Sequence, residues 1–351
     1  MNSLLTERQL KIFQLIIDEF VKSARPIGSR IISENESISV SPATIRNVMA
    51  DLEEMGFLKK THSSSGRIPS QKGYRFYVDH LVTPVTKNIS NVNVIRHILE
   101  DGFYEFEKVV QMSAEVLSDL TNYTTIILGP EVYETRLKQI QIVKLTAHTA
   151  IAILVTNTGL VEHRTFVIPA EINSSDIEKL VNILNERLAG IPMIQLSEKL
   201  DEELRLLIKH NINIVDTVLD HLKEVLKMED ELTAKLYFGG KANLLKQPEF
   251  KDIEKVHSFY SMMEEQDKIA DILKRAEDTL QVTIGRENEY ELIQDFTLVT
   301  APYRLGNDYM GTIALIGPTR MQYRRTITLL KALSYEMTEA FYHWYKDSHL
   351  N

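Results

Sequence analysis

The amino-acid sequence predicts a multidomain α+β protein, and three observations support this fold class. A capped helical pattern followed by two strand-like segments occupies residues 41–70. Strand patterns lie near residues 123–168 and return near residue 281, with helical patterns before, between and after them. The chain has 351 residues, 44% of them hydrophobic, which is enough to form the cores of two or three domains.

The first forty residues predict two helices and a turn. Thr6 and Gln9 can form a capping box at the start of a helix over residues 6–22. The segment 25–28, Arg-Pro-Ile-Gly, ends this helix. A short second helix over residues 29–34 and a turn over residues 35–40 follow it.

The third helix has a clear start signal and two distinct faces. Ser41 is a favourable N-cap, and Pro42 suits the first helical position. One face is an apolar stripe with helical spacing, made of Ile45, Val48, Met49, Leu52 and Met55. The opposite face carries Ala43, Arg46, Asn47 and Ala50, with Thr44 beside them. Small residues allow a helix to approach the major groove closely, and Arg and Asn can read guanine and adenine edges.

A strand, a loop and a return strand follow the third helix. Three helices and then a hairpin are the order of a winged helix-turn-helix, which we expect over residues 1–82. We expect Gly66 to permit a tight turn and Arg67 to reach a phosphate or the minor groove. Ser63, Ser64 and Ser65 could bond phosphates, and they could equally form the turn.

The charge distribution supports a DNA-binding head. Residues 1–82 hold eleven Lys and Arg against nine Asp and Glu, a net charge of +2, whereas the whole chain has a net charge of −9. Between Phe57 and Tyr77 there are five basic residues and no acidic one. Such a stretch favours phosphate binding, although a solvated loop with accidental charge is the alternative.

These patterns define the residues that we expect to bind DNA. Thr44, Arg46 and Asn47 contact bases or nearby phosphates, and Ser41 caps their helix and can also face phosphate. The remaining expected contacts lie in or after the hairpin, and they are Lys59, Lys60, Ser65, Gly66, Arg67 and Arg75.

Beyond residue 82 the patterns are less regular. Residues 83–88 predict a linker that would let the head change its angle relative to the body. Helices are expected at 91–120, 174–227, 267–279 and 321–345, and strands at 123–128, 137–145, 149–155, 160–168, 281–284, 296–303 and 311–316. Strands that stop near 168 and resume near 281 suggest one sheet interrupted by an inserted helical unit.

Several chemical classes of protein are disfavoured. There is no cysteine, so disulfides, thiolate catalysis and Cys-based zinc sites are excluded. The ten histidines show no metal-ligand spacing, and Gly239-Gly240-Lys241 lacks the rest of a phosphate-binding loop. We therefore expect no catalytic residue, metal or cofactor. No apolar signal region and no apolar run of roughly 18 residues are present, so we expect a soluble cytoplasmic protein without a membrane partner.

Four segments resemble the HrcA family of bacterial heat-inducible transcription repressors. They are residues 41–53, 62–69, 73–79 and 311–323, and the similarity spans nearly the whole chain. The resemblance implies a GAF-like α/β domain interrupted by an inserted, mainly helical dimerisation domain. The implied boundaries are 1–82 for the head, 83–102 for a linker and connecting helix, 103–170 and 276–351 for the two GAF-like parts, and 171–275 for the insertion.

The resemblance also implies partners. A homodimer would bind double-stranded DNA at the inverted-repeat CIRCE operator upstream of chaperone operons, and a GroE-type chaperonin would maintain the active repressor. Two other functions remain open from the sequence. One is a repressor that senses a metabolite through the GAF-like domain, and the other is an enzyme with an appended DNA-binding head.

Overall fold

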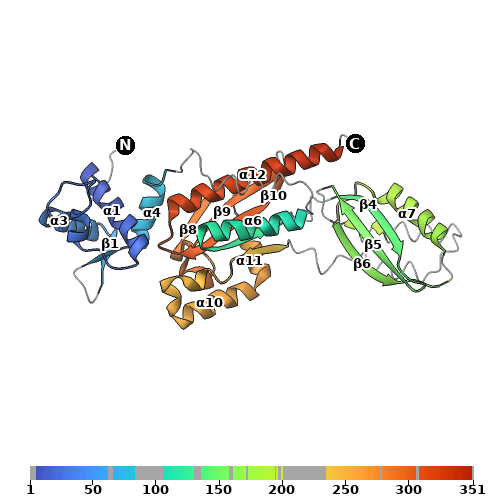
Figure 1. Cartoon of the computed structure of the whole chain (residues 1–351), viewed down its shortest axis with the longest axis horizontal. Coiled ribbons are helices and arrows are strands. Elements are labelled where there is room, and N and C mark those ends of the chain that lie inside the picture. Colours follow the sequence, from blue (N-terminus) through green and yellow to red (C-terminus); the bar gives the residue numbers. More distant parts are fainter. Residues whose placement is uncertain are drawn as a thin grey trace.

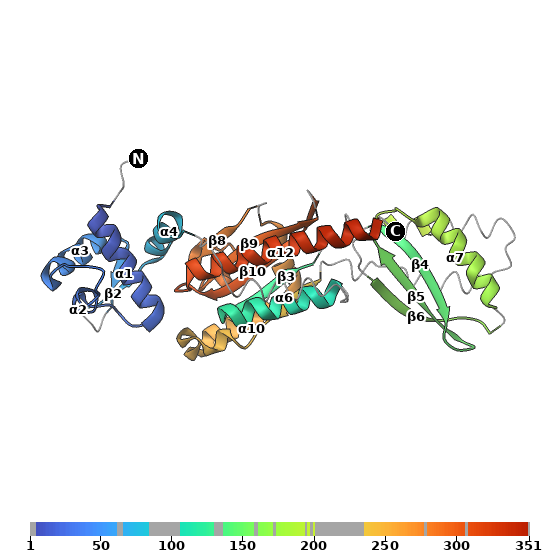
Figure 2. The same ribbon diagram turned by 45° about the horizontal axis from the view of Figure 1, so that its top comes forward.

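The computed structural model describes residues 5–61, 66–83, 106–129, 136–157, 161–170, 173–193, 195–196, 199–200, 235–276, 279–305 and 308–349. Three parts follow one another along an elongated molecule (Figure 1). The N-terminal helices lie at one end, a five-stranded sheet lies in the middle, and a three-stranded sheet lies at the other end (Figure 2). The predicted mixed α+β class is confirmed.

The N-terminal part, which we call the head, contains four helices and a hairpin. Thr6 and Gln9 form the predicted capping box of the first helix. Phe13, Leu52 and Phe57 are buried in the core of the head, where the ring centroids of Phe13 and Phe57 lie 5.7 Å apart. The elements are α1 (Glu7–Ser23), α2 (Ser29–Ser33), α3 (Pro42–Glu54), β1 (Leu58–Lys60), β2 (Arg67–Pro69) and α4 (Gln71–His80).

The middle part, the body, is built on an antiparallel sheet of strand order β7-β3-β10-β9-β8. Its strands are β3 (Thr124–Leu128), β7 (Leu236–Gly239), β8 (Gln281–Ile284), β9 (Phe296–Leu305) and β10 (Asp308–Pro318). Its helices are α6 (Phe106–Thr121), α10 (Ile253–Glu264), α11 (Gln266–Lys274) and α12 (Tyr323–His349). Four short 3-10 helices complete it: η1 (Leu244–Lys246), η2 (Pro248–Lys251), η3 (Gly285–Glu287) and η4 (Glu291–Ile293).

Helices cover both faces of this sheet. Ile127 and Leu315 pack in one core with α6 and α12, and this core continues into the head. Their neighbours Ile126 and Ile316 pack in a second core with α10 and α11. Because both faces are covered, every residue of β3 is buried.

The third part is a smaller antiparallel sheet covered by a helix on one face. Its strands are β4 (Leu137–Lys144), β5 (Thr149–Thr156) and β6 (Val161–Val167), and its helix is α7 (Ser174–Leu188). Ile140, Ala152 and Leu154 share a core with Leu180 and Leu184 of α7. The opposite face of the sheet exposes Val143, Val161 and Val167.

The prediction of one interrupted sheet is wrong for residues 137–168. These strands pair only with one another, whereas β3 pairs with β7 and β10. The short turns of the meander allow neighbouring strands to pair locally, and α7 supplies their apolar cover. Within the predicted insertion 171–275, β7 joins the five-stranded sheet and α10 and α11 pack against it.

The sequence patterns also missed two elements of the body. Residues 236–239 were expected to be irregular, but they form β7, and α10 was not predicted. The expected linker and connecting helix at 83–102 lie almost wholly outside the described residues, as does the expected helical segment beyond residue 200.

Candidate nucleic-acid interface

Helix α3 presents an outward face of the expected composition. Its side chains Ile45, Val48, Met49 and Leu52 are buried in the head. Arg46 and Asn47 lie on the opposite, exposed face, together with Ala43 and Ala50. Neither Arg46 nor Asn47 has a recorded hydrogen bond or ion pair with another described residue. This face of α3 is therefore open to solvent and carries an available guanidinium and an available amide.

The start of α3 explains why this face is fixed in position. The Thr44 backbone amide donates to the Ser41 hydroxyl at 3.3 Å, so Ser41 is the predicted N-cap. The hydroxyls of Ser41 and Thr44 lie 3.0 Å apart. Both side chains therefore help to hold the first turn of α3.

The hairpin carries two exposed lysines, Lys59 and Lys60, at the end of the molecule where α3 lies. Strand β1 pairs Lys59 with Ile68 and Lys60 with Arg67 in an antiparallel register. Lys59 and Lys60 are exposed, and their ammonium groups have no recorded partner among the described residues. Ser65, a predicted contact, lies outside the described residues.

Gly66 is needed for close packing. A Cβ atom at this position would lie 2.8 Å from the Pro26 Cβ and 2.9 Å from the Pro26 carbonyl carbon. Real contacts of that length do not occur, so a side chain here would push the hairpin away from the chain that follows α1. Gly66 thus permits a close approach of two backbone segments, whereas residues 62–65 of the expected turn lie outside the described residues.

Arg67 makes contacts within the head that the sequence did not predict. Its Nε donates to the Glu53 Oε2 on α3 at 2.7 Å, and the Arg67 side chain is only 16% exposed. Its backbone also forms a bridge with Ile27. Arg67 therefore connects the hairpin to α3 and to the segment before α2, and it is not free to reach a phosphate in this arrangement.

Arg67→Ala is accordingly expected to destabilise the head by roughly 1–2 kcal/mol, because it removes a half-buried ion pair and leaves the Glu53 carboxylate without its partner. Hydrogen exchange of the α3 amides would measure this. Unchanged exchange combined with weakened DNA binding would contradict the packing role and restore Arg67 as a DNA contact.

Arg75 also lies away from the α3 face. Its guanidinium contacts Glu287 of the body, with Nη2 2.6 Å from Oε2, and Asp79 of its own helix at 3.0 Å. Hydrogen bonds to these two carboxylates raise the pKa of Arg75 although burial opposes them. Arg75 therefore joins the head to the body in this arrangement, and its expected phosphate contact stays a prediction.

Two partners in these contacts, Glu53 and Glu287, were not anticipated from the sequence. Glu53 lies between Leu52 and Met55 of the apolar stripe, and Glu287 lies over two hundred residues from Arg75. Ion pairs between residues so far apart leave no periodic signal in a single sequence.

Comparisons with known proteins identify the family. A family model described as the HrcA protein C-terminal domain matches residues 107–327. The heat-inducible transcription repressor HrcA of Oceanobacillus iheyensis is 54% identical over 343 residues, covering 98% of this chain and 99% of that protein. The protein of the same description from Halalkalibacterium halodurans is 46% identical, covering 98% and 100%. The chain belongs to the HrcA family.

Membership in the HrcA family decides the class of protein. This HrcA-family chain is a transcription repressor and not an enzyme. A crystal structure of a hypothetical protein shares its fold, with a TM-score of 0.72 and 22% identity over 97% of this chain and 99% of that one.

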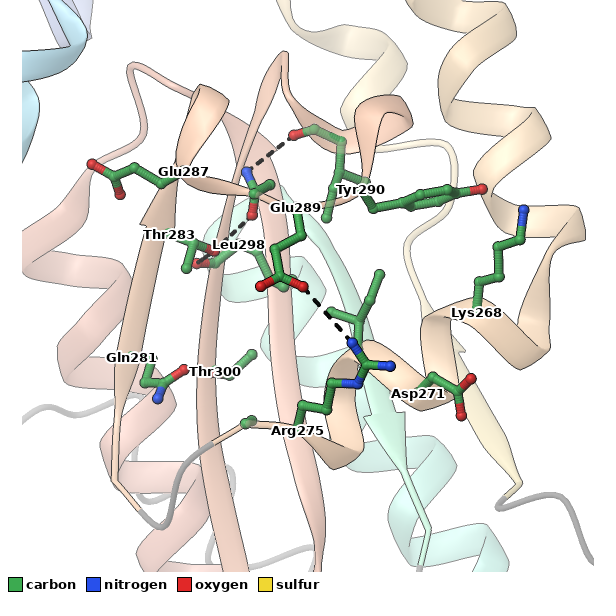
Figure 3. Close-up of a pocket in the computed structure, with 14 residues that line it drawn as sticks. Lys268, Asp271, Arg275, Gln281, Thr283, Glu287, Glu289, Tyr290, Leu298 and Thr300 are labelled. Carbon is green, nitrogen blue, oxygen red and sulfur yellow. Dashed lines mark hydrogen bonds and ion pairs between the residues drawn. The ribbon is translucent and has the colours of Figure 1, made fainter.

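The body of this HrcA-family chain contains a cavity of about 450 Å³ between α11, β8, β9 and η4 (Figure 3). Its floor includes Ile272 and Leu298, and its rim carries both signs of charge. The Arg275 Nη1 lies 3.7 Å from the Glu289 Oε2, and Lys268 is paired with Glu265. Since the cations have carboxylate partners, the lining does not present one dominant sign of charge to a ligand.

The part of the chain that the structure describes contains no cluster of three His, Asp or Glu side chains arranged to hold a metal ion. None of its helices combines the length and the apolarity required to cross a bilayer.

Proposed function

We propose that this chain represses heat-shock operons by binding an inverted-repeat operator of the CIRCE type as a homodimer. The observation that carries the proposal is the outward face of α3, where Arg46 and Asn47 are exposed and unpaired while the apolar stripe behind them is buried. The names of the two relatives support heat-inducible repression. A short helix reads few base pairs, and a two-fold dimer doubles this readout.

The head has the element order of a winged helix-turn-helix, which supports α3 as the reading helix and the β1–β2 hairpin as the wing. The five-stranded body corresponds to the proposed GAF-like domain. The pairing of β3 with β7 supports an insertion between residues 130 and 234, in place of 171–275. The exposed valines on the open face of β4–β6 support this insertion as the dimerisation domain.

The proposal includes a regulatory partner and a cellular place. A GroE-type chaperonin maintains the active repressor in the cytoplasm, and unfolded clients draw the chaperonin away on heating. Binding of operator DNA after dilution from mild denaturant tests this step. Purified chaperonin should increase the fraction of repressor that binds, and an equal recovery without it would contradict the partnership.

The function is tested by titrating the chain with three duplexes: the inverted repeat, a single half-site and a scrambled sequence. We expect affinity in the order inverted repeat, half-site, scrambled. Specific sites commonly bind ~10³-fold or more tightly than random DNA, so equal affinity for the repeat and the scrambled duplex would contradict the proposal.

Lys60→Ala tests the wing. We expect it to weaken binding to the operator and to random DNA alike, and to lower the slope of log affinity against log salt by about one, because one phosphate contact is lost. Anisotropy titrations at several salt concentrations would measure both effects. Arg286→Ala on the body removes one exposed cation and is the matched control. A loss confined to the operator would contradict the phosphate role of Lys60.

The alternative is a repressor that senses a metabolite, and the cavity beside β8 is the observation that favours it. A ligand that binds only the folded state stabilises it by an amount that grows with the logarithm of its concentration over its dissociation constant. Thermal-shift measurements across a metabolite set test this alternative, and a shift that Leu298→Trp abolishes would support it.

A further inference from the structure

The head is fastened to the body by a strip of the chain around β8. The Gln71 side-chain amide donates to the Ile284 carbonyl at 2.6 Å. Arg75 binds the Glu287 carboxylate through two nitrogens, Nη2 at 2.6 Å and Nε at 3.1 Å, and Nη2 also donates to the Val282 carbonyl. Gln71 and Arg75, one turn apart on α4, therefore contact alternate residues of the edge strand β8 and the 3-10 helix η3 that follows it. We call Val282, Ile284 and Glu287 the docking strip.

Aromatic packing supports the same contact. The rings of Tyr74 and Tyr77 lie 5.8 Å and 6.4 Å from that of Tyr323 at the start of α12. All three side chains are buried, and burial raises the pKa of each phenol. A second polar contact lies nearby, where the Arg320 guanidinium donates to the Val21 carbonyl at the end of α1 and pairs with Glu249.

This contact leaves the DNA-reading face free. Helix α4 lies between the rest of the head and the body, and α3 lies on the far side of the head in both views (Figures 1 and 2). Arg46 and Asn47 stay exposed while Gln71 and Arg75 are engaged. The docked head is therefore compatible with DNA binding, and the contact fixes the direction in which α3 points.

From this geometry we infer that Arg75, Glu287 and Gln71 are positioning residues that determine which half-site spacing the dimer accepts. The inference rests on the proposed dimeric operator binding. If each head is fixed to its body, the body dimer sets the separation and relative rotation of the two reading helices. Without these contacts the direction of each head would no longer be fixed by its body, so the two heads would reach half-sites over a range of separations, at a lower effective concentration.

The ion pair is the part of the contact most open to change. The Arg75 and Glu287 side chains are each 31% exposed, whereas the tyrosines beside them are buried. Charge reversal at Arg75 places a carboxylate against those of Glu287 and of Asp79 on α4 and removes all three hydrogen bonds from Arg75 to the docking strip. It leaves α3, the hairpin and the head core untouched. Arg75→Glu is thus directed at the placement of the head and not at its fold.

The test compares Arg75→Glu, Gln71→Ala and the double variant Arg75→Glu/Glu287→Arg with the unchanged chain. Arg286→Glu is the matched control, because it makes the same charge change beside Glu287 at an exposed residue with no recorded partner among those described. Each protein is titrated with a single half-site, the native inverted repeat, and repeats whose spacer is longer by two base pairs. Two base pairs rotate one half-site by roughly 70° relative to the other.

We expect the unchanged chain and Arg286→Glu to prefer the native spacing. Arg75→Glu should bind the single half-site within about twofold of the unchanged chain, but lose on the order of tenfold in its preference for the native over the lengthened repeat. Gln71→Ala should lose part of this preference. The double variant should regain it in part, since Glu287 also accepts the Ile284 amide and that bond is not restored.

An unaltered spacing preference in Arg75→Glu, with half-site binding intact, would overturn the inference. An equal loss in Arg286→Glu would overturn it as well, because a general charge effect would then explain the result. Should the unchanged chain bind the inverted repeat no better than one half-site, the proposed dimeric function fails instead. If Arg75→Glu loses half-site binding through misfolding, the spacing preference of Gln71→Ala tests the inference, because this substitution removes a single side-chain hydrogen bond. An unaltered preference in Gln71→Ala would then overturn the inference.

Discussion

Arg46→Ala is expected to weaken operator binding by ~1–3 kcal/mol and to change binding to random DNA far less. The reason is that a bidentate arginine contact to a guanine edge discriminates between base pairs, whereas phosphate contacts do not. The same expectation holds for Asn47→Ala, whose amide can read adenine. Competition gel shifts with operator and scrambled duplexes would show the effect as a fall of roughly 5- to 150-fold in the specificity ratio.

Two features make this prediction decisive. Both side chains are exposed and have no recorded partner among the described residues, so their truncation leaves the head core intact. Arg8→Ala removes an exposed arginine from α1 in the same head and serves as the control. Equal losses for operator and scrambled DNA in Arg46→Ala would assign that residue to the phosphate backbone and remove it from base reading.

Gly73→Ala is expected to produce the largest loss of stability in the head. A Cβ atom at this position would lie 2.2 Å from the Phe57 carbonyl oxygen, an impossible contact with backbone that cannot rotate away. Helix α4 would have to separate from the hairpin, at a cost near or above the upper end of the roughly 1–3 kcal/mol typical of overpacking. Hydrogen exchange of the backbone amides of residues 42–54 and 71–80 would measure this loss of stability within the head. Tryptophan fluorescence would not report on the head, because the single tryptophan, Trp344, lies in α12.

Gly28→Ala is the matched control for this substitution. Gly28 is an N-cap with a φ of −95°, and a Cβ atom there would meet nothing within 4 Å. The change should cost no more than about 1 kcal/mol, the difference between glycine and alanine at a cap. Similar exchange rates in the two variants would show that α4 can shift without consequence for the head.

The head could be predicted almost completely from the sequence because its signals are local. Ser41, Pro42 and the apolar stripe specify α3 within a dozen residues, and the capping box at Thr6 specifies the start of α1. Exposure of Arg46 and Asn47 follows from the same periodicity. The ion pairs of Arg67 and Arg75 could not be predicted, because their carboxylate partners are set by tertiary contacts that a basic stretch does not reveal.

The separation of the three-stranded sheet from the sheet of the body has a local signal in the sequence. Strand β3 is a continuous run of Thr, Ile and Leu, as expected when both faces are covered, and all five of its residues are buried. From Gln139 onward strand β4 alternates, with Ile140 buried and Ile142 half-buried between the exposed residues Gln139, Gln141 and Val143. Such alternation indicates a sheet with one solvated face. Pairing partners that are distant along the chain, such as β3 and β7, carry no such local signal.

The two ends of the long excursion between β3 and β7 lie beside each other. Leu128 pairs with Leu236, and the Gly129 amide donates to the Lys235 carbonyl at 2.8 Å. A tight two-residue connection can join neighbouring antiparallel strands, so the body has no architectural need for the residues in between. The segment between Gly129 and Lys235 can therefore change in length or be replaced without a change in the strand order of the sheet. A different association domain could be grafted onto the same pair of strands.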